Sequence, residues 1–168
     1  MNQSNISTRK ALSRKMNYLR ILGSSLGCCI GIGVVGYLST VTYSALLIPS
    51  FGASCVIGMT IPDSAFAQPR NVIGGHFLSG LIGLLCTVSL GTSWWSLAIA
   101  VGLASAIMQS TRTLHPPAAS DPILFMVHGS LSPYFFLMLL VIGSIILIIF
   151  FVSYHRFVTK RSYPKYWI

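Results

Sequence analysis

Long stretches without charge constrain this chain more than any other feature of its sequence. Asp, Glu, Lys and Arg are absent from the 42 residues 21–62 and the 41 residues 71–111, and the 43 residues 113–155 contain only Asp121. A helix needs about 20 apolar residues to cross a bilayer. Each stretch therefore has room for two crossings, and the three stretches predict six.

Composition supports a membrane protein over a soluble one. Charged residues make up 8% of the 168 residues and mean hydropathy is +0.76, whereas roughly 25% charge is usual in soluble domains. These values exclude a soluble enzyme, a disordered tail and a disulfide-stapled secreted module. The net charge of +9 does not indicate a nucleic-acid partner, because the basic residues lie outside the apolar stretches and leave no solvated basic face.

The predicted fold is an all-α, polytopic membrane helix bundle. Small polar breaks divide the charge-free stretches into six spans, which are 21–39, 43–62, 71–90, 94–111, 115–129 and 134–154. They form a single transmembrane domain over 21–155, with a basic arm at 1–20 and a basic tail at 156–168. Apolar residues recur at helical spacing among the basic ones in 7–20, which predicts a short helix on the membrane surface.

The distribution of basic residues predicts the orientation. With six spans, all 11 Lys and Arg residues fall on one side of the bilayer. Cytoplasmic loops are enriched in these residues. We therefore expect both termini to be cytoplasmic, and we expect the protein to lie in a bacterial inner membrane with the lipid bilayer as its surroundings.

Two series of small residues recur every fourth position, a spacing that favours close helix packing. They are Gly23, Gly27 and Gly31, and Gly102, Ala106 and Ser110. Packing within one subunit is the favoured interpretation, and a homo-oligomer stays open. The four cysteines Cys28, Cys29, Cys55 and Cys86 lack paired spacing, so no metal site and no cofactor is expected.

Two of the spans contain backbone that is unsuited to continuous helix. Pro49 interrupts the first, and Pro116 and Pro117 interrupt the second. About 12 apolar residues remain after each break, too few to cross a bilayer alone. Broken backbone at membrane depth is tolerated only where protein or a water-filled cavity surrounds it.

The positions of the two breaks indicate an inverted repeat. Ala53-Ser54 and Ala119-Ser120 are separated by 66 residues, and each pair lies in the second span of its half. Three spans per half reverse the direction of the chain, so 21–90 and 94–154 are predicted to form a 3+3 inverted repeat. Corresponding interrupted segments point to a transport site, and we expect Ser54 and Ser120 to meet near the middle of the bilayer.

Ionisable and hydroxyl side chains near the breaks are the candidate binding residues. The substrate-binding candidates are Arg112, His115, Pro116, Pro117, Ser120 and Asp121, together with Ser50, Gly52 and Ser54, and the secondary candidates are Arg70, Asn71 and His76. The alternative for Arg112 and Asp121 is an ion pair that only ties the broken segment together. The alternative for His76 is a packed, hydrogen-bonded residue.

Three motifs in order resemble the HPP family of integral membrane proteins, named after its His-Pro-Pro motif. They are residues 49–54, 68–76 and 113–119, and the resemblance runs from about Arg20 to about Tyr154. Members of this family in chloroplasts and cyanobacteria are known as nitrite transporters. The resemblance therefore implies a transporter or channel for a small inorganic anion, with nitrite as the expected substrate.

The residues themselves suit a small anion. Arg112 and a protonated His115 would supply positive potential, and the opened helix start would supply N–H groups. No ATP-binding motif is present, so movement would be channel-like or secondary, with His115 or Asp121 as candidates for proton coupling. A non-transporting membrane subunit that binds a partner is the alternative. A membrane enzyme is less favoured, because no nucleophile–base arrangement is visible, and we expect no enzymatic activity.

Overall fold

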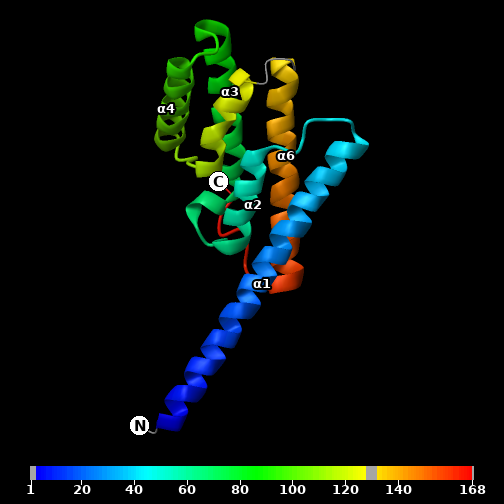
Figure 1. Cartoon of the computed structure of the whole chain (residues 1–168), viewed down its shortest axis with the longest axis vertical. Helices are drawn as coiled ribbons and strands as arrows, with labels where there is room; N and C mark the ends of the chain where they lie inside the picture. The colour runs from blue at the N-terminus through cyan, green and yellow to red at the C-terminus, as the bar shows by residue number, and fades with distance from the viewer. Residues whose placement is uncertain (1–2, 128–131, 168) are drawn as a thin grey trace.

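The computed structural model describes residues 3–127 and 132–167, and these are helical with no strand among them (Figure 1). The α-helices are α1 (Gln3–Val41), α2 (Pro49–Thr60), α3 (Pro69–Leu90), α4 (Trp94–Ser110), α5 (Asp121–Val127) and α6 (Pro133–Tyr154). The 3₁₀ turns η1 (Ala65–Ala67) and η2 (Pro116–Ser120) precede α3 and α5, and the π-helical turn η3 (His155–Thr159) follows α6. The predicted all-α class is confirmed.

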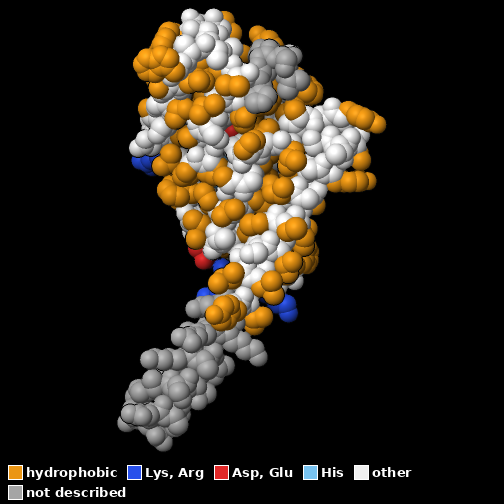
Figure 2. Space-filling model, viewed as in Figure 1, with side chains coloured by type: hydrophobic (Ala, Val, Ile, Leu, Met, Phe, Trp, Pro, Cys, Tyr) orange, Lys and Arg blue, Asp and Glu red, His pale blue; other side chains and the backbone are white. Residues whose placement is uncertain are grey.

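Three helices are long and apolar enough to cross a membrane, over Tyr18–Val41, Pro69–Leu90 and Tyr134–Thr159. Helix α4 is also apolar but has 17 residues. Apolar side chains spread over the visible face of the bundle, while Lys and Arg side chains occupy few places (Figure 2). This surface is the one expected of a protein whose solvent is lipid.

The basic arm is not a separate helix. Residues 3–20 continue directly into the first predicted span as the 39-residue helix α1, which extends beyond the rest of the bundle (Figure 1). The short helix predicted over 7–20 is therefore the first part of a longer helix that includes the first span. Neither proline nor glycine occurs between Gln3 and Leu22, so nothing in the sequence interrupts the backbone hydrogen bonds.

Both predicted breaks are confirmed. Helix α2 starts at Pro49 after the extended residues 45–48 and has 12 residues. In the second half, residues 113–115 are extended and are followed by η2 and the seven-residue α5. The two short helical segments begin near the middle of the bundle and run toward opposite ends of its long axis (Figure 1).

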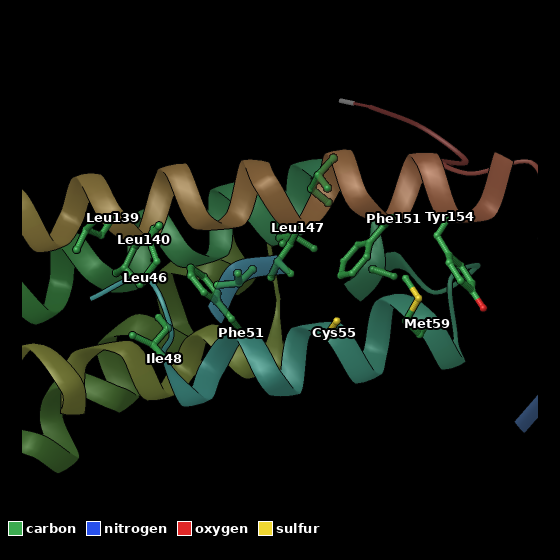
Figure 3. Close-up of a cluster of buried hydrophobic side chains, with 14 of the residues drawn as sticks. Leu46, Ile48, Phe51, Cys55, Met59, Leu139, Leu140, Leu147, Phe151 and Tyr154 are labelled. Carbon is green, nitrogen blue, oxygen red and sulfur yellow. The ribbon is translucent and has the colours of Figure 1, made fainter. Parts of the chain in front are cut away.

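The main apolar core joins α2 to α6. Leu139, Leu140, Leu147 and Phe151 of α6 face Phe51, Cys55 and Met59 of α2 across the interface in Figure 3. Glycines allow the two helices to approach closely, because a Cβ on Gly58 would clash with the Phe151 ring and one on Gly143 with the Phe51 ring. This contact holds α2 in place although the helix is too short to cross the bilayer.

The two small-residue series have different surroundings. A Cβ on Gly27 would lie 2.6 Å from the sulfur of Met59, and one on Gly31 would lie 2.7 Å from that of Cys55, so this face of α1 packs within the chain. Around Gly102 of α4, no described atom from beyond the neighbouring helix backbone lies within 4 Å of the corresponding position. The first series therefore fits the favoured interpretation, and the second faces away from the bundle.

Candidate functional site

Polar side chains from both broken segments meet against α3. Ser54 comes from α2, His76 from α3, and His115 and Asp121 stand at either end of η2. Each of these four residues has 0% exposure. The extended backbone lies close to α3 because of Gly75, where an added Cβ would be 2.7 Å from the Cβ of His115.

A continuous chain of hydrogen bonds joins these four side chains. The Oδ2 atom of Asp121 lies 2.7 Å from His76 Nδ1, and His76 Nε2 lies 3.0 Å from Ser54 Oγ. Ser54 Oγ lies 2.7 Å from His115 Nε2. The chain ends where His115 Nδ1 lies 2.7 Å from the carbonyl oxygen of Phe66.

Donor and acceptor chemistry limits where the hydrogens of this chain can be. The Phe66 carbonyl only accepts, so His115 Nδ1 donates to it. Asp121 and His76 together hold at least one hydrogen in the bond between them. Ser54 has a single hydroxyl hydrogen, so the direction of its two bonds to the imidazoles depends on which imidazole carries a hydrogen on Nε2.

Two arrangements with the same number of hydrogens satisfy every bond. In one, His76 Nε2 donates to Ser54 and Ser54 donates to His115. In the other, His115 Nε2 donates to Ser54 and Ser54 donates to His76. They differ by one proton passed from one imidazole to the other through the serine, without movement of a heavy atom.

A third arrangement accommodates one more proton. Ser54 Oγ also lies 2.9 Å from the backbone oxygen of Ser50. When the hydroxyl donates to that oxygen, its two lone pairs accept from Nε2 of both His76 and His115. The site then carries a net charge of +1, whereas the preceding arrangements are neutral with Asp121 counted.

Two buried polar atoms at this chain have no hydrogen-bond partner among the described residues. They are Ser50 Oγ and Asp121 Oδ1. Buried polar groups are hydrogen-bonded in nearly all native structures. One hydroxyl and one carboxylate oxygen are therefore available to a small polar ligand. Phe51 packs edge-on against the His76 ring, with the two ring centroids 5.0 Å apart, and so covers the site with an apolar side chain.

Side chains of α3 satisfy the irregular backbone of the second broken segment. Asn71 Nδ2 donates to the carbonyl of Leu114 at 3.0 Å, and Ser79 Oγ donates to that of Ala118 at 2.5 Å. Just before the extended residues 113–115, the carbonyl of Thr111 accepts from the Arg70 side chain at 3.1 Å. These contacts explain how a non-helical stretch persists inside an apolar bundle.

The C-terminal tail supports the loop that carries Phe66. Tyr163 OH donates to the carbonyl of Ala67 at 2.6 Å, and the backbone N–H of Lys165 donates to Gln68 Oε1 at 2.8 Å. Lys165 also pairs with Asp63 at 3.0 Å. The predicted basic tail is thus packed against the 63–68 loop over these residues, and it indirectly positions the carbonyl that holds His115.

Comparison with known proteins identifies the family. The sequence model of the HPP transmembrane region matches residues 13–164. The chain belongs to the HPP family. Family membership and the long apolar helices together make this HPP protein an integral membrane protein.

The chain is also similar to two transmembrane proteins of Dictyostelium discoideum. One is 36% identical over 129 residues, which cover 73% of this chain and 45% of the relative. The other is 29% identical over 154 residues, which cover 87% of this chain and 49% of the relative. The chain thus spans about half the length of these curated relatives. No solved structure matches it.

The His-Pro-Pro motif of this HPP chain has one member inside the network. His115 is fully buried, Pro117 is buried and Pro116 is exposed. The Ser120 hydroxyl donates to the carbonyl of Pro117 at 2.9 Å and so closes the 3₁₀ turn. The residue of the second half that meets Ser54 is therefore His115, rather than the predicted Ser120.

Two predicted residues lie apart from the hydrogen-bond chain. Arg112 is exposed and adopts a left-handed φ of 57°. Asp121 pairs with His76, so the Arg112–Asp121 ion pair considered from the sequence is wrong. Gly52 makes no close approach, because no atom of another described segment lies within 4 Å of an added Cβ.

Sequence reasoning placed His76 second and gave no role to Phe66 or Ser79. The signal for His76 was present, because it follows Gly74-Gly75 in an otherwise apolar span. The signal for Phe66 was absent, because its contribution is a backbone carbonyl. No separation along the sequence reveals the order Ser54, His76, Asp121, which the fold assembles from three elements.

Proposed function

We propose that this HPP protein moves a small inorganic anion across the membrane together with a proton, with nitrite as the expected substrate. The observation that carries this proposal is the buried chain Asp121–His76–Ser54–His115, which links the two broken segments. Ionisable residues at membrane depth are costly and mark ion and proton paths. Corresponding interrupted segments in the two halves are typical of transport sites.

The hydrogen-bond arrangements supply a means of coupling. A proton that enters at His115 or His76 is accommodated when the Ser54 hydroxyl turns to the backbone oxygen of Ser50. The site then has a charge of +1 and attracts one anion. Movement of one anion with one proton is electroneutral, and the desolvation cost of an uncompensated charge is avoided.

The unpartnered atoms give the anion its local contacts. Ser50 Oγ has a hydrogen to donate, and Asp121 Oδ1 can accept from a protonated ligand or from a water molecule. Because the chain of four side chains is neutral before the extra proton enters and carries +1 afterwards, the Asp121 carboxylate, bonded to His76, does not repel the anion as an isolated one would. A negatively charged ligand is therefore compatible with the acid in the site.

Arg70 and Arg112 also attract the anion, from the surface of the protein on the side that the predicted topology makes cytoplasmic. They flank the start of the second broken segment, with Arg70 bonded to the Thr111 carbonyl and Arg112 exposed. Surface arginines raise the local concentration of an anion, and salt screens that effect. We assign them to attraction at the entrance rather than to proton coupling.

The proposed topology keeps six membrane segments and both termini on the cytoplasmic side, in an inner membrane if the protein is bacterial. The order long, short, long occurs in 21–90 and again in 94–154. We propose that the two halves are inverted repeats, and that α2 and η2–α5 act as half-helices starting at the bilayer middle. Labelling of Thr92 from outside tests the orientation. Ser130, between the fifth and sixth predicted spans, should also be labelled from outside, and it lies outside the described residues.

Flux measurements in proteoliposomes test the coupling. Purified full-length protein is reconstituted, nitrite or formate is added outside, and internal pH is followed with a trapped dye while the membrane potential is set with potassium and valinomycin. We expect one proton to enter per nitrite, uptake to increase with an inward proton gradient, and no response to the potential. Comparing the rates of formate and nitrite uptake shows whether the site prefers nitrite.

Matched serine variants show whether the relay matters. Ser54→Ala removes the hydroxyl that connects both imidazoles and should lower proton-coupled uptake about tenfold or more. Ser50→Ala keeps the backbone oxygen and should weaken nitrite affinity without changing the ratio of one proton per anion. Arg112→Gln should lower uptake at low ionic strength only. Nitrite uptake that is unchanged in Ser54→Ala, or independent of the proton gradient, contradicts the proposal.

A specific observation favours a second candidate, an intramembrane serine hydrolase. The Ser54 hydroxyl faces His76 Nε2 while Asp121 faces Nδ1, the order found in catalytic triads. In that function His76 would take the Ser54 proton as the oxygen attacks an acyl group. A fluorophosphonate probe discriminates between the two. Labelling that is lost in Ser54→Ala and kept in Ser50→Ala supports the hydrolase, whereas coupled flux without labelling supports the transporter.

A further inference from the structure

A second polar feature lies away from the histidine chain, at the end of the bundle where α1 meets α6. It is a pocket of about 650 Å³ between α1, the end of α2 and the junction of α6 with η3. None of its lining residues belongs to the Asp121–His76–Ser54–His115 chain. The function proposed above gives this pocket no role.

Two arginines face this pocket from distant parts of the chain. Arg20 comes from α1 and Arg161 follows η3. None of the described residues that line the pocket is acidic, and the nearby Asp63 is paired with Lys165. The pocket therefore has a net positive charge that its own side chains leave uncompensated.

The backbone after α6 is shaped to bring Arg161 to this position. The helix widens into the π-helical turn η3, and Lys160 then adopts a left-handed φ of 52°. The N–H of Arg161 donates to the carbonyl of His155 at 2.9 Å and so folds the chain back. Left-handed conformations are unfavourable for a side chain such as lysine, and π-turns and such outliers concentrate at functional sites.

The floor of the pocket is polar and hydrogen-bonded. His155 is buried, with Nε2 2.8 Å from the carbonyl of Gly58 and Nδ1 3.1 Å from Thr159 Oγ1. Since the Gly58 carbonyl only accepts, His155 Nε2 donates its hydrogen to that carbonyl and has none left for a ligand. His155 therefore acts as a spacer between α2 and η3, and the two arginines are left to contact a ligand.

The rim combines this charge with apolar side chains. Leu19 and Ile21 on either side of Arg20 are each 60% exposed, and Met59 lines the inner wall. Arg20 is also the last basic residue before the 42-residue charge-free stretch, so it lies where the chain passes from the interface into the hydrocarbon. Lipid phosphates occupy that level of the bilayer.

We propose that this pocket binds the phosphate of an anionic lipid headgroup. Guanidinium groups present paired N–H donors that match phosphate oxygens, and two of them converge here from α1 and from the tail. The exposed Leu19 and Ile21 would contact the adjoining acyl chains. A bound lipid would link the first helix to the segment after the last one.

Lipid titrations of the full chain test this site. Purified protein in detergent is titrated with phosphatidylglycerol and, as a zwitterionic control, phosphatidylcholine, and bound lipid is counted by native mass spectrometry. Each of Arg20→Gln and Arg161→Gln should weaken phosphatidylglycerol binding about fivefold, and the double variant about 25-fold. Arg156→Gln is the matched control. It removes a charge from η3 itself, outside the pocket lining, and should leave binding within about twofold.

Three outcomes overturn the proposal. The first is wild-type binding of phosphatidylglycerol by the double variant, and the second is an equal loss in Arg156→Gln. The third is displacement of the lipid by millimolar inorganic phosphate, with the same thermal stabilisation by phosphate alone, which would make the ligand a free anion. If a Gln variant does not fold, Arg20→Lys and Arg161→Lys keep the positive charge but lose the paired N–H donors of the guanidinium. These variants should retain preference for phosphatidylglycerol over phosphatidylcholine.

Discussion

The two interrupted segments have a similar architecture and different chemistry. Both consist of extended backbone followed by a short helical stretch that begins at a proline, over 45–60 and over 113–127. The first contributes the hydroxyl of Ser54, from the interior of α2. The second contributes His115 and Asp121, one on each side of η2. All of the ionisable groups that the broken segments contribute to the hydrogen-bond chain thus come from the second one.

This difference reflects how each group is held. Ser54 belongs to a regular helix, which satisfies its own backbone and packs on α6 (Figure 3). His115 follows extended backbone, whose carbonyls depend on side chains of α3 such as Asn71. A hydroxyl can be placed by helix geometry alone, whereas the imidazole needs external partners. The second segment should therefore be the more sensitive of the two to substitution.

The largest effect is expected from Asp121→Ala. Removing the carboxylate leaves the buried Nδ1 of His76 without its partner, and the free energy of unfolding should fall by about 3–5 kcal/mol, as it does when one partner of a buried pair is lost. Asp121→Asn keeps an oxygen that accepts from His76 Nδ1 and should cost clearly less. Unfolding in mild detergent, followed by circular dichroism, measures both. Equal stability of the Ala variant and the wild type would show that the pair does not hold the second segment.

The fold could largely be predicted from the sequence because the bilayer restricts helix length. Charge-free stretches located all six helical segments, and Pro49 and Pro116 marked the two interruptions. The site could be predicted only in part. His76 and Asp121 are 45 positions apart, and their meeting depends on the rotation of α3 against η2, which helix periodicity does not specify.

Arg112 shows that closeness in sequence can also mislead. It is three positions from His115 along the chain, and that proximity predicted a shared site. Its left-handed φ of 57° turns the chain between α4 and the extended residues 113–115, and its side chain is exposed. Neighbours in sequence share a helix face only while the helix continues, and here it has ended.

An intermediate effect is expected from Gly75→Ala, which tests the approach of the second segment to α3. The new methyl would lie 2.7 Å from the Cβ of His115 and 3.2 Å from the carbonyl oxygen of Thr113. The resulting shift should lower the free energy of unfolding by about 1–3 kcal/mol. Proteoliposome flux on the same variant should show weaker proton coupling, because His115 would move relative to Ser54.

Gly52→Ala is the matched control in the first segment. No atom of another described segment lies within 4 Å of its added methyl, and an alanine in helix α2 should be neutral or stabilise the protein by up to about 1 kcal/mol. A larger loss in Gly52→Ala than in Gly75→Ala would reverse the comparison, because the first segment would then be the one held by close approach.

The smallest effect is expected at the C-terminal tail, which supports the second segment only indirectly, through the 63–68 loop. Tyr163 OH donates to the Ala67 carbonyl at 2.6 Å, next to the Phe66 carbonyl that holds His115. Burial raises the pKa of Tyr163 above its ordinary value, because the phenolate would lose its hydration. The unfolded chain releases this proton near pH 10 while the folded chain retains it. This contribution to stability is therefore complete below about pH 10 and is lost as the pH rises further.

Tyr163→Phe removes both the hydrogen bond and the titrating group. The free energy of unfolding should fall by about 0.5–1.5 kcal/mol near neutral pH, and the additional loss above about pH 10 should disappear. Tyr166→Phe, at an exposed tyrosine of the same tail, should change neither quantity. Unfolding midpoints measured in detergent between neutral and alkaline pH give the comparison. If Tyr163→Phe keeps the alkaline loss of the wild type, another group causes it, and the tail does not stabilise the 63–68 loop in the way its contacts indicate.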